Sequence, residues 1–396
     1  MNILWALFAM ALGSFGGTSV AADLGHSNNS QLPSLSSSLN TAIIQSQKEQ
    51  VVIDANNPPP KVDPQPDAPI VKGIYVTAYS AGGARMAQLL ELTDQTELNA
   101  MVIDVKDDLG YITYPTENTA VNKMGEAKSF IRDINALMKR LEKHKVYPIA
   151  RIVVFKDTIL AKKNPDLSFR NQDGSVWANG KGDSFVNPYS KEVWDYNIEI
   201  AKEAAKLGFK EIQFDYVRFP EGFETRADKL KYSQTDQSRV DVVAEFVQYA
   251  RKELAPLGVR VSVDIFGYAA SVPAAEGIGQ DFVKISENVD VISPMVYPSH
   301  YSTGWYGVKD PDKDPYTTIK GSMKDTHKKL DPTEELKPVI RPWIQDFTAS
   351  WLGSGHYIKY GKKQVEDQIR AMKEMNVDEY LLWNASNRYT PGVQYK

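Results

Sequence analysis

Eight short runs of apolar and β-branched residues recur along the chain from residue 73 onward, and segments with helical spacing separate them. In one such segment, Val243, Phe246 and Val247 lie three and four residues apart, and Ala250 and Leu254 continue the stripe. Repeated strand–helix units form a parallel sheet, and eight of them predict a (β/α)8 TIM barrel. The expected strands are Gly73–Thr77, Ala100–Lys106, Pro148–Phe155, Glu211–Tyr216, Val259–Phe266, Asp290–Tyr297, Pro338–Gln345 and Glu379–Asn384.

The connections differ in length according to their direction. Links from helix to strand are short, as at Leu207–Lys210 and Pro256–Gly258. Links from strand to helix are long, and four of them span 156–189, 217–234, 298–313 and 346–360. Barrel enzymes build their sites from these loops at the carboxyl ends of the strands. An open doubly wound sheet is the alternative fold, but it needs a glycine-rich phosphate turn after the first strand, and Ala81–Ala84 is too short for one.

The beginning of the chain has a different composition. Residues 3–20 carry no charge and lead to Ala21-Ala22, which is typical of a signal peptide over 1–22, with an uncleaved membrane anchor as the alternative. Residues 23–69 are rich in serine and then proline, which predicts a flexible linker. We therefore expect an exported protein, periplasmic or extracellular, whose folded domain covers 70–396.

Composition excludes several classes of function. The 46 Lys and Arg residues are balanced by 50 Asp and Glu residues, so no basic surface for nucleic acid is expected. The absence of cysteine excludes disulfides, thiolate metal sites and cysteine nucleophiles. None of the five histidines forms an HxH or HxxxH pair. Asp310, Asp312 and Asp314 alternate as calcium ligands can, yet we interpret them as a solvated loop. The expectation is a monomer without a cofactor.

Acidic residues occupy the last inward positions of three expected strands. Alternation along a strand places Asp104, Asp215 and Asp264 inside the barrel at its carboxyl end. A structural layer of ion pairs is the simpler explanation, since buried charges need partners. Three such carboxylates together favour acetal hydrolysis instead, in which one carboxyl protonates the leaving oxygen and another attacks or stabilises the sugar cation. Asp215 and Asp264 lie on neighbouring strands, about 5 Å apart across the sheet.

Aromatic residues are frequent in the long loops. A sugar ring needs an apolar face beside hydroxyl-binding groups, and aromatic side chains provide such faces. The connection 156–189 contains Asn171–Gly174, a turn signal that predicts a hairpin of Leu167–Arg170 against Ser175–Ala178. We expect this hairpin to hold Trp177 near an incoming sugar, with simple packing against the barrel as the alternative. The loop aromatics are Trp177, Tyr301, Trp305, Tyr306, Trp351 and Tyr357.

Several of these segments resemble the DUF4015 family of TIM-barrel-type glycoside hydrolases. The resemblance covers most of 70–390 and is most specific at Phe214–Pro220. Met295–Tyr297 and Trp383 are also similar to strands of chitinase-like barrels, but the DxxDxDxE motif is absent from the fourth strand, so substrate-assisted chemistry is not implied. The other matching stretches are Gly73–Tyr79, Val102–Asp108, Asn187–Ser190, Glu211–Phe214, Val263–Gly267 and Ile292–Pro298.

These observations lead to a specific hypothesis about the site. Asp215 is the expected nucleophile or stabilising carboxylate and Asp264 the general acid/base, although the two roles could be exchanged. Asp104 is a third carboxylate, and Arg218 and Lys106 would hold Asp215 ionised or contact substrate. The expected substrate-binding residues are Lys106, Arg151, Arg218, Tyr75, Tyr297, Trp343, Gln345, Trp383 and Trp177.

The predicted activity is hydrolysis of an envelope or extracellular polysaccharide. One alternative is a carbohydrate-binding barrel without catalytic activity. Another is a phosphosugar lyase or isomerase, which would need a phosphate loop after strands seven and eight. Gly353-Ser-Gly355 is the candidate for that loop, and a surface turn explains it better.

Overall fold

The computed structural model describes residues 64–331 and 338–396. The expected signal peptide and most of the expected linker lie outside the described residues. Parallel strands occupy all eight expected positions, and the seventh is divided into two short strands. They are β1 (Lys72–Val76), β2 (Ala100–Lys106), β5 (Tyr147–Val153), β6 (Glu211–Asp215), β7 (Arg260–Phe266), β8 (Val291–Met295), β9 (Val339–Ile340) with β10 (Trp343–Gln345), and β11 (Tyr380–Trp383).

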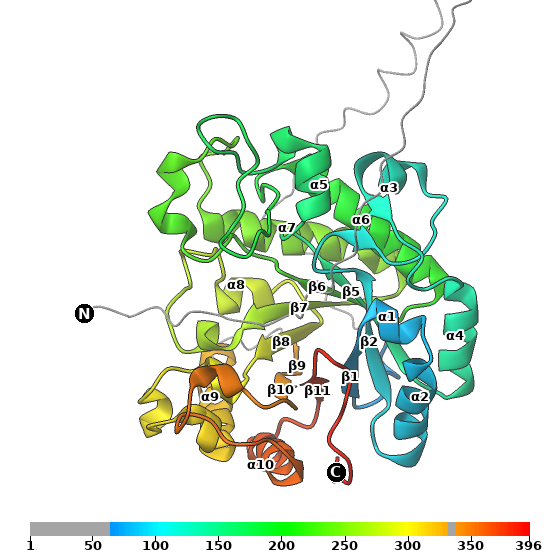
Figure 1. Cartoon of the computed structure of the whole chain (residues 1–396), viewed down its shortest axis with the longest axis vertical. Coiled ribbons are helices and arrows are strands. Elements are labelled where there is room, and N and C mark those ends of the chain that lie inside the picture. Colours follow the sequence, from blue (N-terminus) through cyan, green and yellow to red (C-terminus); the bar gives the residue numbers. More distant parts are fainter. Residues whose placement is uncertain (1–63, 332–337) are drawn as a thin grey trace, which may run out of the picture. The chain divides into compact units, whose positions relative to one another are not determined.

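The sheet closes on itself. Its order is β1-β11-β10-β8-β7-β6-β5-β2, and β1 pairs in parallel with both β2 and β11. At the closure Gly73 lies opposite Ala100 and Leu381, and a Cβ atom there would stand 2.6 Å from a methyl group of Leu381. Glycine therefore allows the strands to approach. The predicted TIM barrel is confirmed, and Figure 1 shows its strands surrounded by helices.

Helices follow the strands along the chain. Gly208 caps the carboxyl end of α6 (Lys191–Leu207) and adopts the left-handed conformation with φ of 104°. Ser238 caps the amino end of α7 (Arg239–Leu254), and its hydroxyl accepts a hydrogen bond from the backbone of Asp241. No helix among the described residues is long and apolar enough to cross a membrane. The helices are α1 (Ala78–Ala81), α2 (Arg85–Gln95), α3 (Thr119–Met124), α4 (Ile134–Lys143), α5 (Thr158–Lys163), α6 (Lys191–Leu207), α7 (Arg239–Leu254), α8 (Phe282–Ser286), α9 (Pro315–Leu330) and α10 (Lys362–Lys373).

Two parts of the chain depart from the regular alternation of strands and helices, the connection after β2 and the segment after β11. The connection after β2 contains two short strands, β3 (Tyr111–Ile112) and β4 (Glu126–Ala127), and β3 pairs antiparallel with β2. After β11, residues 384–396 form turns and loops rather than a helix. Their last residues still pack on the barrel, because Tyr395 is buried and its carbonyl accepts a hydrogen bond from Tyr380.

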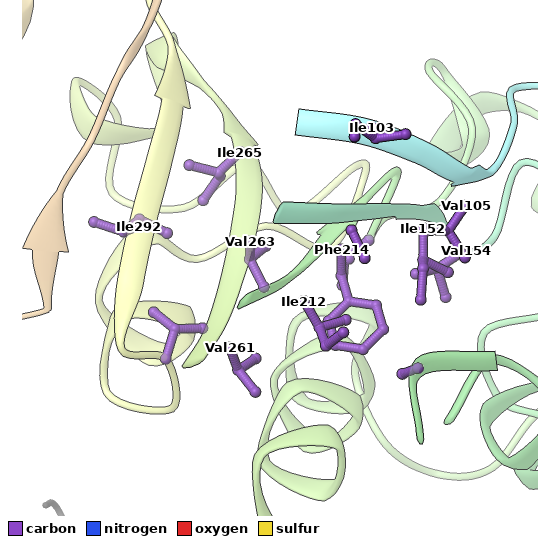
Figure 2. Packing of buried hydrophobic residues seen from close by; sticks show 14 of the residues in the cluster. Ile103, Val105, Ile152, Val154, Ile212, Phe214, Val261, Val263, Ile265 and Ile292 are labelled. Atoms are coloured by element: carbon purple, nitrogen blue, oxygen red, sulfur yellow. The ribbon is translucent and has the colours of Figure 1, made fainter. Parts of the chain in front are cut away.

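The outer faces of the strands form the main core. Figure 2 shows Ile212 and Phe214 of β6 beside Val261 and Val263 of β7, and all four are buried. The ring of Phe214 lies 5.6 Å from that of Phe246 on α7. The expected division of each strand into a helix-facing set and an inward set is therefore present on β6 and β7. The inward positions of the strands hold the polar and aromatic residues of the candidate site.

Residues 64–69 contact the barrel although their composition had placed them in the linker. The side-chain amide of Gln65 donates to the carbonyls of Lys210 and Gly258 at 2.8 and 3.0 Å. Arg260, at the start of β7, donates to the carbonyl of Gln65 at 3.2 Å. The structured domain thus begins a few residues before residue 70. Proline-rich composition did not reveal this, because the contacts join segments almost two hundred residues apart.

Candidate active site

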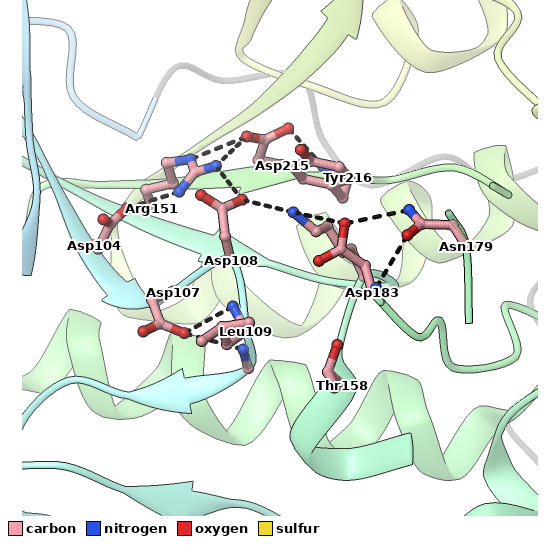
Figure 3. Close-up of polar contacts among 12 residues, drawn as sticks. Asp104, Asp107, Asp108, Leu109, Arg151, Thr158, Asn179, Asp183, Asp215 and Tyr216 are labelled. Atoms are coloured by element: carbon pink, nitrogen blue, oxygen red, sulfur yellow. Dashed lines mark hydrogen bonds and ion pairs between the residues drawn. The ribbon is translucent and has the colours of Figure 1, made fainter. Parts of the chain in front are cut away.

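Arg151 connects three carboxylates at the carboxyl end of the barrel. Its Nη1 donates to Asp104 Oδ1 at 2.7 Å, and its Nε and Nη2 donate to Asp215 Oδ2 at 3.0 and 2.6 Å. Nη2 also lies 3.2 Å from Asp108 Oδ1 (Figure 3). The guanidinium is 1% exposed, and such a planar fork holds carboxylates in fixed orientations. Arg151 comes from β5 and stands between β2 and β6, the strands that pair with β5.

The backbone turns sharply after Asp215. Tyr216 has a φ of 52°, in the left-handed region that bulky residues rarely adopt. This turn directs the backbone N–H of Tyr216 to Asp215 Oδ1 at 2.6 Å, so both carboxylate oxygens accept hydrogen bonds. Strained backbone of this kind gathers at functional sites, where the surrounding structure enforces it. The strain marks Asp215 as a residue whose position matters.

Asp264 lies on the strand beside Asp215. Phe214 of β6 is paired with Val263 of β7, and the two aspartates follow these residues directly. Asp264 Oδ1 accepts a hydrogen bond from the indole Nε1 of Trp343 at 2.7 Å. Burial and the nearby charge of Asp215 raise the pKa of Asp264 well above its usual range. Asp264 therefore holds its proton to higher pH than an exposed aspartate does, whereas Asp215 forms an ion pair with Arg151 at 2.6 Å.

Asp104 is the third buried carboxyl group. The hydroxyl of Tyr75 donates to its Oδ2 at 2.6 Å, and Arg151 binds the other oxygen. Burial raises the pKa of Asp104 to about 6, although the charge of Arg151 and the bond from Tyr75 oppose the shift. This carboxyl group changes its charge close to neutral pH.

Aromatic rings surround Arg151 on the inner side of the barrel. Tyr75 and Trp383 are stacked with centroids 4.1 Å apart and an angle of 15°. The guanidinium of Arg151 lies 5.5 Å from the first ring and 5.6 Å from the second. Tyr297 lies 6.4 Å from Trp383, and Trp343 meets Trp383 edge-on at 5.4 Å. The structure thus brings together all four aromatic residues that the sequence suggested for strand positions.

Two charged residues of the site were missed by the sequence argument. Asp108 lies just beyond β2, with a side chain 40% exposed, and contacts both Arg151 and Lys156. Lys156 Nζ lies 3.7 Å from Asp108 and also from Asp183, and it stands over the ring of Tyr216. Burial lowers the pKa of Lys156, but the surrounding negative charges, first that of Asp108, raise it above its usual value. The acidic pair that directly follows the second strand was the available signal for Asp108.

Lys106 is not where the sequence argument placed it. A β-bulge between Asp104 and Lys106 shifts the register, so that these two residues no longer share a face. Lys106 instead makes a fully buried ion pair with Asp157 at 2.7 Å and donates to Asn197 of α6 at 2.9 Å. The expected contact of Lys106 with Asp215 is therefore wrong. Its role is to join β2 to the helices outside the barrel.

Arg218 and Gln345 lie near the site but bind other partners. Arg218 pairs with Glu221 at 2.8 Å, and its guanidinium stands over the rings of Tyr216 and Phe266. It therefore supports the turn after Asp215 and does not bind that carboxylate directly. Gln345 donates to Asp312 at 2.8 Å and to the carbonyl of Phe347 at 3.0 Å, so it holds the loops after β8 and β10 together.

The region of the three alternating aspartates differs from a solvated loop. Asp312 is buried and accepts bonds from Gln345 and from the backbone of Ile358. Asp314 caps α9, and Asp310 faces His356. Their expected solvation is wrong for Asp312, because the loop after β10 folds over it. Within the described ranges, no group of three or more His, Asp or Glu residues has a geometry that could hold a metal ion.

The predicted hairpin in the connection after β5 is present. Arg170 pairs with Val176 across the turn, and Gly174 there has a φ of 91°. Trp177 is half-buried, with its ring 6.4 Å from that of Phe185 and 5.3 Å from the guanidinium of Arg226. Asp183, near the end of this segment, contacts Lys156 as described above. The connection that contains the hairpin is therefore linked to the carboxylate cluster through an ion pair of Asp183 with Lys156.

A second layer of buried charge lies at the opposite end of the barrel. Arg341 pairs with Glu211 at 2.7 Å and with Glu379 at 2.7 Å, and the arginine side chain is fully buried. Glu211 begins β6 and Glu379 precedes β11, so these groups lie at the amino ends of the strands. In this layer the buried charges form ion pairs that stabilise the barrel, which is the structural role that the sequence also allowed for its buried charges. A surface hollow of about 250 Å³ at this end, between Ile70 and Glu379, is lined by none of the site carboxylates.

A comparison of this chain with known protein families identifies its family. The model of the DUF4015 family, described as "Putative glycosyl hydrolase domain", matches residues 73–389. The chain belongs to the DUF4015 family. The resemblance inferred from the sequence motifs is confirmed, and the matched range contains every strand of the barrel except the first residue of β1. A search of curated proteins finds no match to this DUF4015 chain.

Solved structures similar to this DUF4015 domain include TIM-barrel glycoside hydrolases. A hypothetical protein from Ruminiclostridium thermocellum ATCC 27405 is 35% identical over 48% of this chain and 96% of its own, with a TM-score of 0.44. The PgaB (BpsB) glycoside hydrolase domain from Bordetella bronchiseptica is 12% identical over 80% of this chain and 94% of its own, with a TM-score of 0.56. At 12% identity, the likeness to the Bordetella bronchiseptica domain shows the fold alone. The DUF4015 domain is thus a glycosyl-hydrolase-like TIM barrel.

Proposed function

We propose that this protein is an exported glycoside hydrolase that cleaves an envelope or extracellular polysaccharide and acts as a monomer. The observation that carries the proposal is the pair formed by Asp264 and Asp215 on adjacent strands. The raised pKa of Asp264 keeps a proton available, while Arg151 forms an ion pair with Asp215 at 2.6 Å. Hydrolysis of an acetal by paired carboxyl groups uses a proton donor and a carboxylate side by side. Export is supported by the uncharged segment 3–20 and the small residues after it.

The two carboxyl groups have distinct roles in this mechanism. Asp264 donates its proton to the glycosidic oxygen as the bond to the anomeric carbon breaks, and Asp215 attacks or stabilises the positive charge that develops there. A water molecule, deprotonated by Asp264, then bonds to the anomeric carbon, any bond between that carbon and Asp215 breaks, and Asp264 and Asp215 return to their starting states. Neighbouring strands set the two residues about 5 Å apart, which suits the closely spaced pair of a retaining enzyme. Sequence alone leaves the two roles open, and the pKa of Asp264, raised by burial and by the charge of Asp215, favours this residue as the acid.

The remaining residues would bind the sugar. Trp383 and Tyr75 present stacked rings, and the inner faces of Tyr297 and Trp343 lie beside them. Asp104 and the partly exposed Asp108 offer carboxylate oxygens to sugar hydroxyls. Sites of this kind combine apolar faces with a few fixed polar groups. The ion pair of Arg151 orients two of these carboxylates toward the same region.

The test is hydrolysis of a panel of bacterial glycans. We expect the wild type to release product from at least one glycan, and Asp215→Asn and Asp264→Asn to lose most of that activity. Asp173→Asn is the matched control, because Asp173 lies in the exposed hairpin turn, where it accepts hydrogen bonds from Ser175. Full activity of Asp215→Asn on a good substrate would show that the assignment is wrong.

One observation favours a second function, a carbohydrate-binding barrel without catalysis. Both oxygens of Asp215 already accept hydrogen bonds, from Arg151 and from the backbone of Tyr216. A carboxylate engaged in this way is a weak nucleophile unless substrate displaces a donor. Under this alternative the protein retains a glycan tightly, forms no product, and binds equally well as Asp264→Asn.

A further inference from the structure

A continuous line of aromatic rings runs from the surface to the carboxylate cluster. Its outer end is Trp351, which is 40% exposed and stacks on Phe347 with centroids 5.7 Å apart and an angle of 23°. Phe347 lies 5.8 Å from Tyr297, and Tyr297 lies 6.4 Å from Trp383. Trp383 stacks on Tyr75 at 4.1 Å. The inner end of the line is thereby fixed to Asp104, which Tyr75 contacts.

The loop after β10 holds the outer two rings in place. The carbonyl of Phe347 accepts a hydrogen bond from Gln345 at 3.0 Å. Trp351 lies in a single 3-10 turn, Ser350–Leu352, which Leu352 closes with a bond to the carbonyl of Ala349. The backbone of Tyr360 donates to Thr348 at 3.1 Å and fixes the far side of the loop. These contacts hold the rings in position before any ligand arrives.

The exposure of Trp351 is not explained by packing. A tryptophan that serves as an anchor buries its ring, whereas Trp351 leaves a large part of its surface to solvent. Exposed aromatic surface that continues into a functional site marks a binding surface. The inner rings already belong to the proposed sugar site, and the stacked outer pair extends it by two platforms. Tyr297 and Tyr75 are themselves buried, and the rings of the line with exposed surface are Trp351, Phe347 and Trp383. A ligand that reaches from the first to the last of these must be a chain of several sugar rings.

We propose that Trp351 and Phe347 form an outer glycan-binding platform for sugar units distant from the bond that is cleaved. This inference rests on the proposed function and narrows it, because it makes the substrate a linear oligosaccharide or polysaccharide that crosses the loop after β10. Binding energy from remote units contributes to the rate only when the chain is long enough to reach them. Short substrates therefore do not use the platform.

Tyr79 provides a matched control. It is 70% exposed, lies on α1 at the same end of the barrel, and contacts Phe130 with ring centroids 4.4 Å apart and an angle of 41°. Its ring contacts belong to the connections after β1 and β2, apart from the line that ends at Trp351. Replacing either exposed residue with alanine removes a surface aromatic ring and leaves the core intact.

The experiment measures binding and turnover separately on the full chain. Affinity electrophoresis in gels that contain glycol chitin, hydroxyethyl cellulose or xylan reports binding without any need for cleavage. Hydrolysis of a glycan series from two to eight units reports kcat/KM. Wild type, Trp351→Ala, Phe347→Ala and Tyr79→Ala are compared, and melting temperatures show whether each variant is folded.

The expected result is a loss confined to long chains. Trp351→Ala should lower kcat/KM about tenfold on the longest oligosaccharides and leave the shortest unchanged, and Tyr79→Ala should match the wild type throughout. Equal kinetics of Trp351→Ala and wild type on long chains would overturn the platform while the hydrolase function stands. Retention of a polysaccharide that depends on Trp351, without product, would support the platform and overturn the hydrolase. A wild type that neither binds nor cleaves any of these glycans would count against both.

Discussion

The indole Nε1 of Trp343 donates a hydrogen bond to Oδ1 of Asp264 over 2.7 Å, and both side chains are almost completely buried. This single bond stabilises the ionised carboxylate, but burial and the neighbouring charge of Asp215 act more strongly in the opposite direction. Asp264 therefore keeps its proton well above the pH at which an exposed aspartate loses it.

Asp264→Asn should abolish activity and yet increase stability at neutral pH. Between about pH 4 and its raised pKa, folded Asp264 retains a proton that the unfolded chain has released, so rising pH removes stability through this window. Asparagine has no proton to lose and still accepts the bond from Trp343. Thermal melts of both proteins across this pH range should diverge as pH rises. Curves that stay parallel would show that Asp264 is ionised in the folded protein.

Arg151→Met and Arg341→Met should both destabilise the protein, by about 3–5 kcal/mol each, because each leaves buried carboxylates without a partner. Only Arg151→Met should also lower kcat per folded molecule, since Arg341 binds Glu211 and Glu379 at the amino end of the barrel. Urea unfolding and kinetics corrected for the folded fraction measure the two effects. An equal loss of kcat in both variants would mean that the charge of Arg151 is purely structural.

Tyr75→Phe should shift the pH dependence of activity. The hydroxyl of Tyr75 lowers the pKa of Asp104, which burial has raised to about 6, so its removal raises that pKa further. If ionised Asp104 binds the substrate, kcat/KM rises as pH passes through about 6 in the wild type. In the variant the same rise should occur at higher pH. Tyr380→Phe is the control, because that hydroxyl bonds to Tyr395 at the other end of the barrel.

Trp177→Ala should weaken substrate binding and lower the melting temperature only slightly. Full burial would make truncation cost about 3–5 kcal/mol, but Trp177 is only partly buried between Phe185 and Arg226. Kinetics on long glycans and melting curves are measured together. A large drop in melting temperature with unchanged kinetics would show that Trp177 serves only to anchor the hairpin.

The residues that the sequence located correctly are those whose position depends on local periodicity. Asp215 lies two residues after Gln213 on β6, and Asp264 lies two residues after Ser262 on β7. Alternation along each strand is therefore sufficient to place both aspartates inside the barrel. Lys106 shows where this reasoning fails. One bulged residue after Asp104 reverses the alternation, and a bulge depends on the pairing of β2 with β5, which no local pattern reveals.

The sequence by itself therefore determined the eight strands, their order of alternation with helices and the end at which acidic residues gather, because hydrophobic periodicity is a property of short segments. Only the tertiary structure decided which of these acids has a strongly raised pKa. That shift depends on burial and on groups brought from other strands, such as the charge of Asp215 and the indole of Trp343 beside Asp264. It also decided that Asp108 and Lys156 join the site, because their contacts exist only once the loops are folded over the barrel.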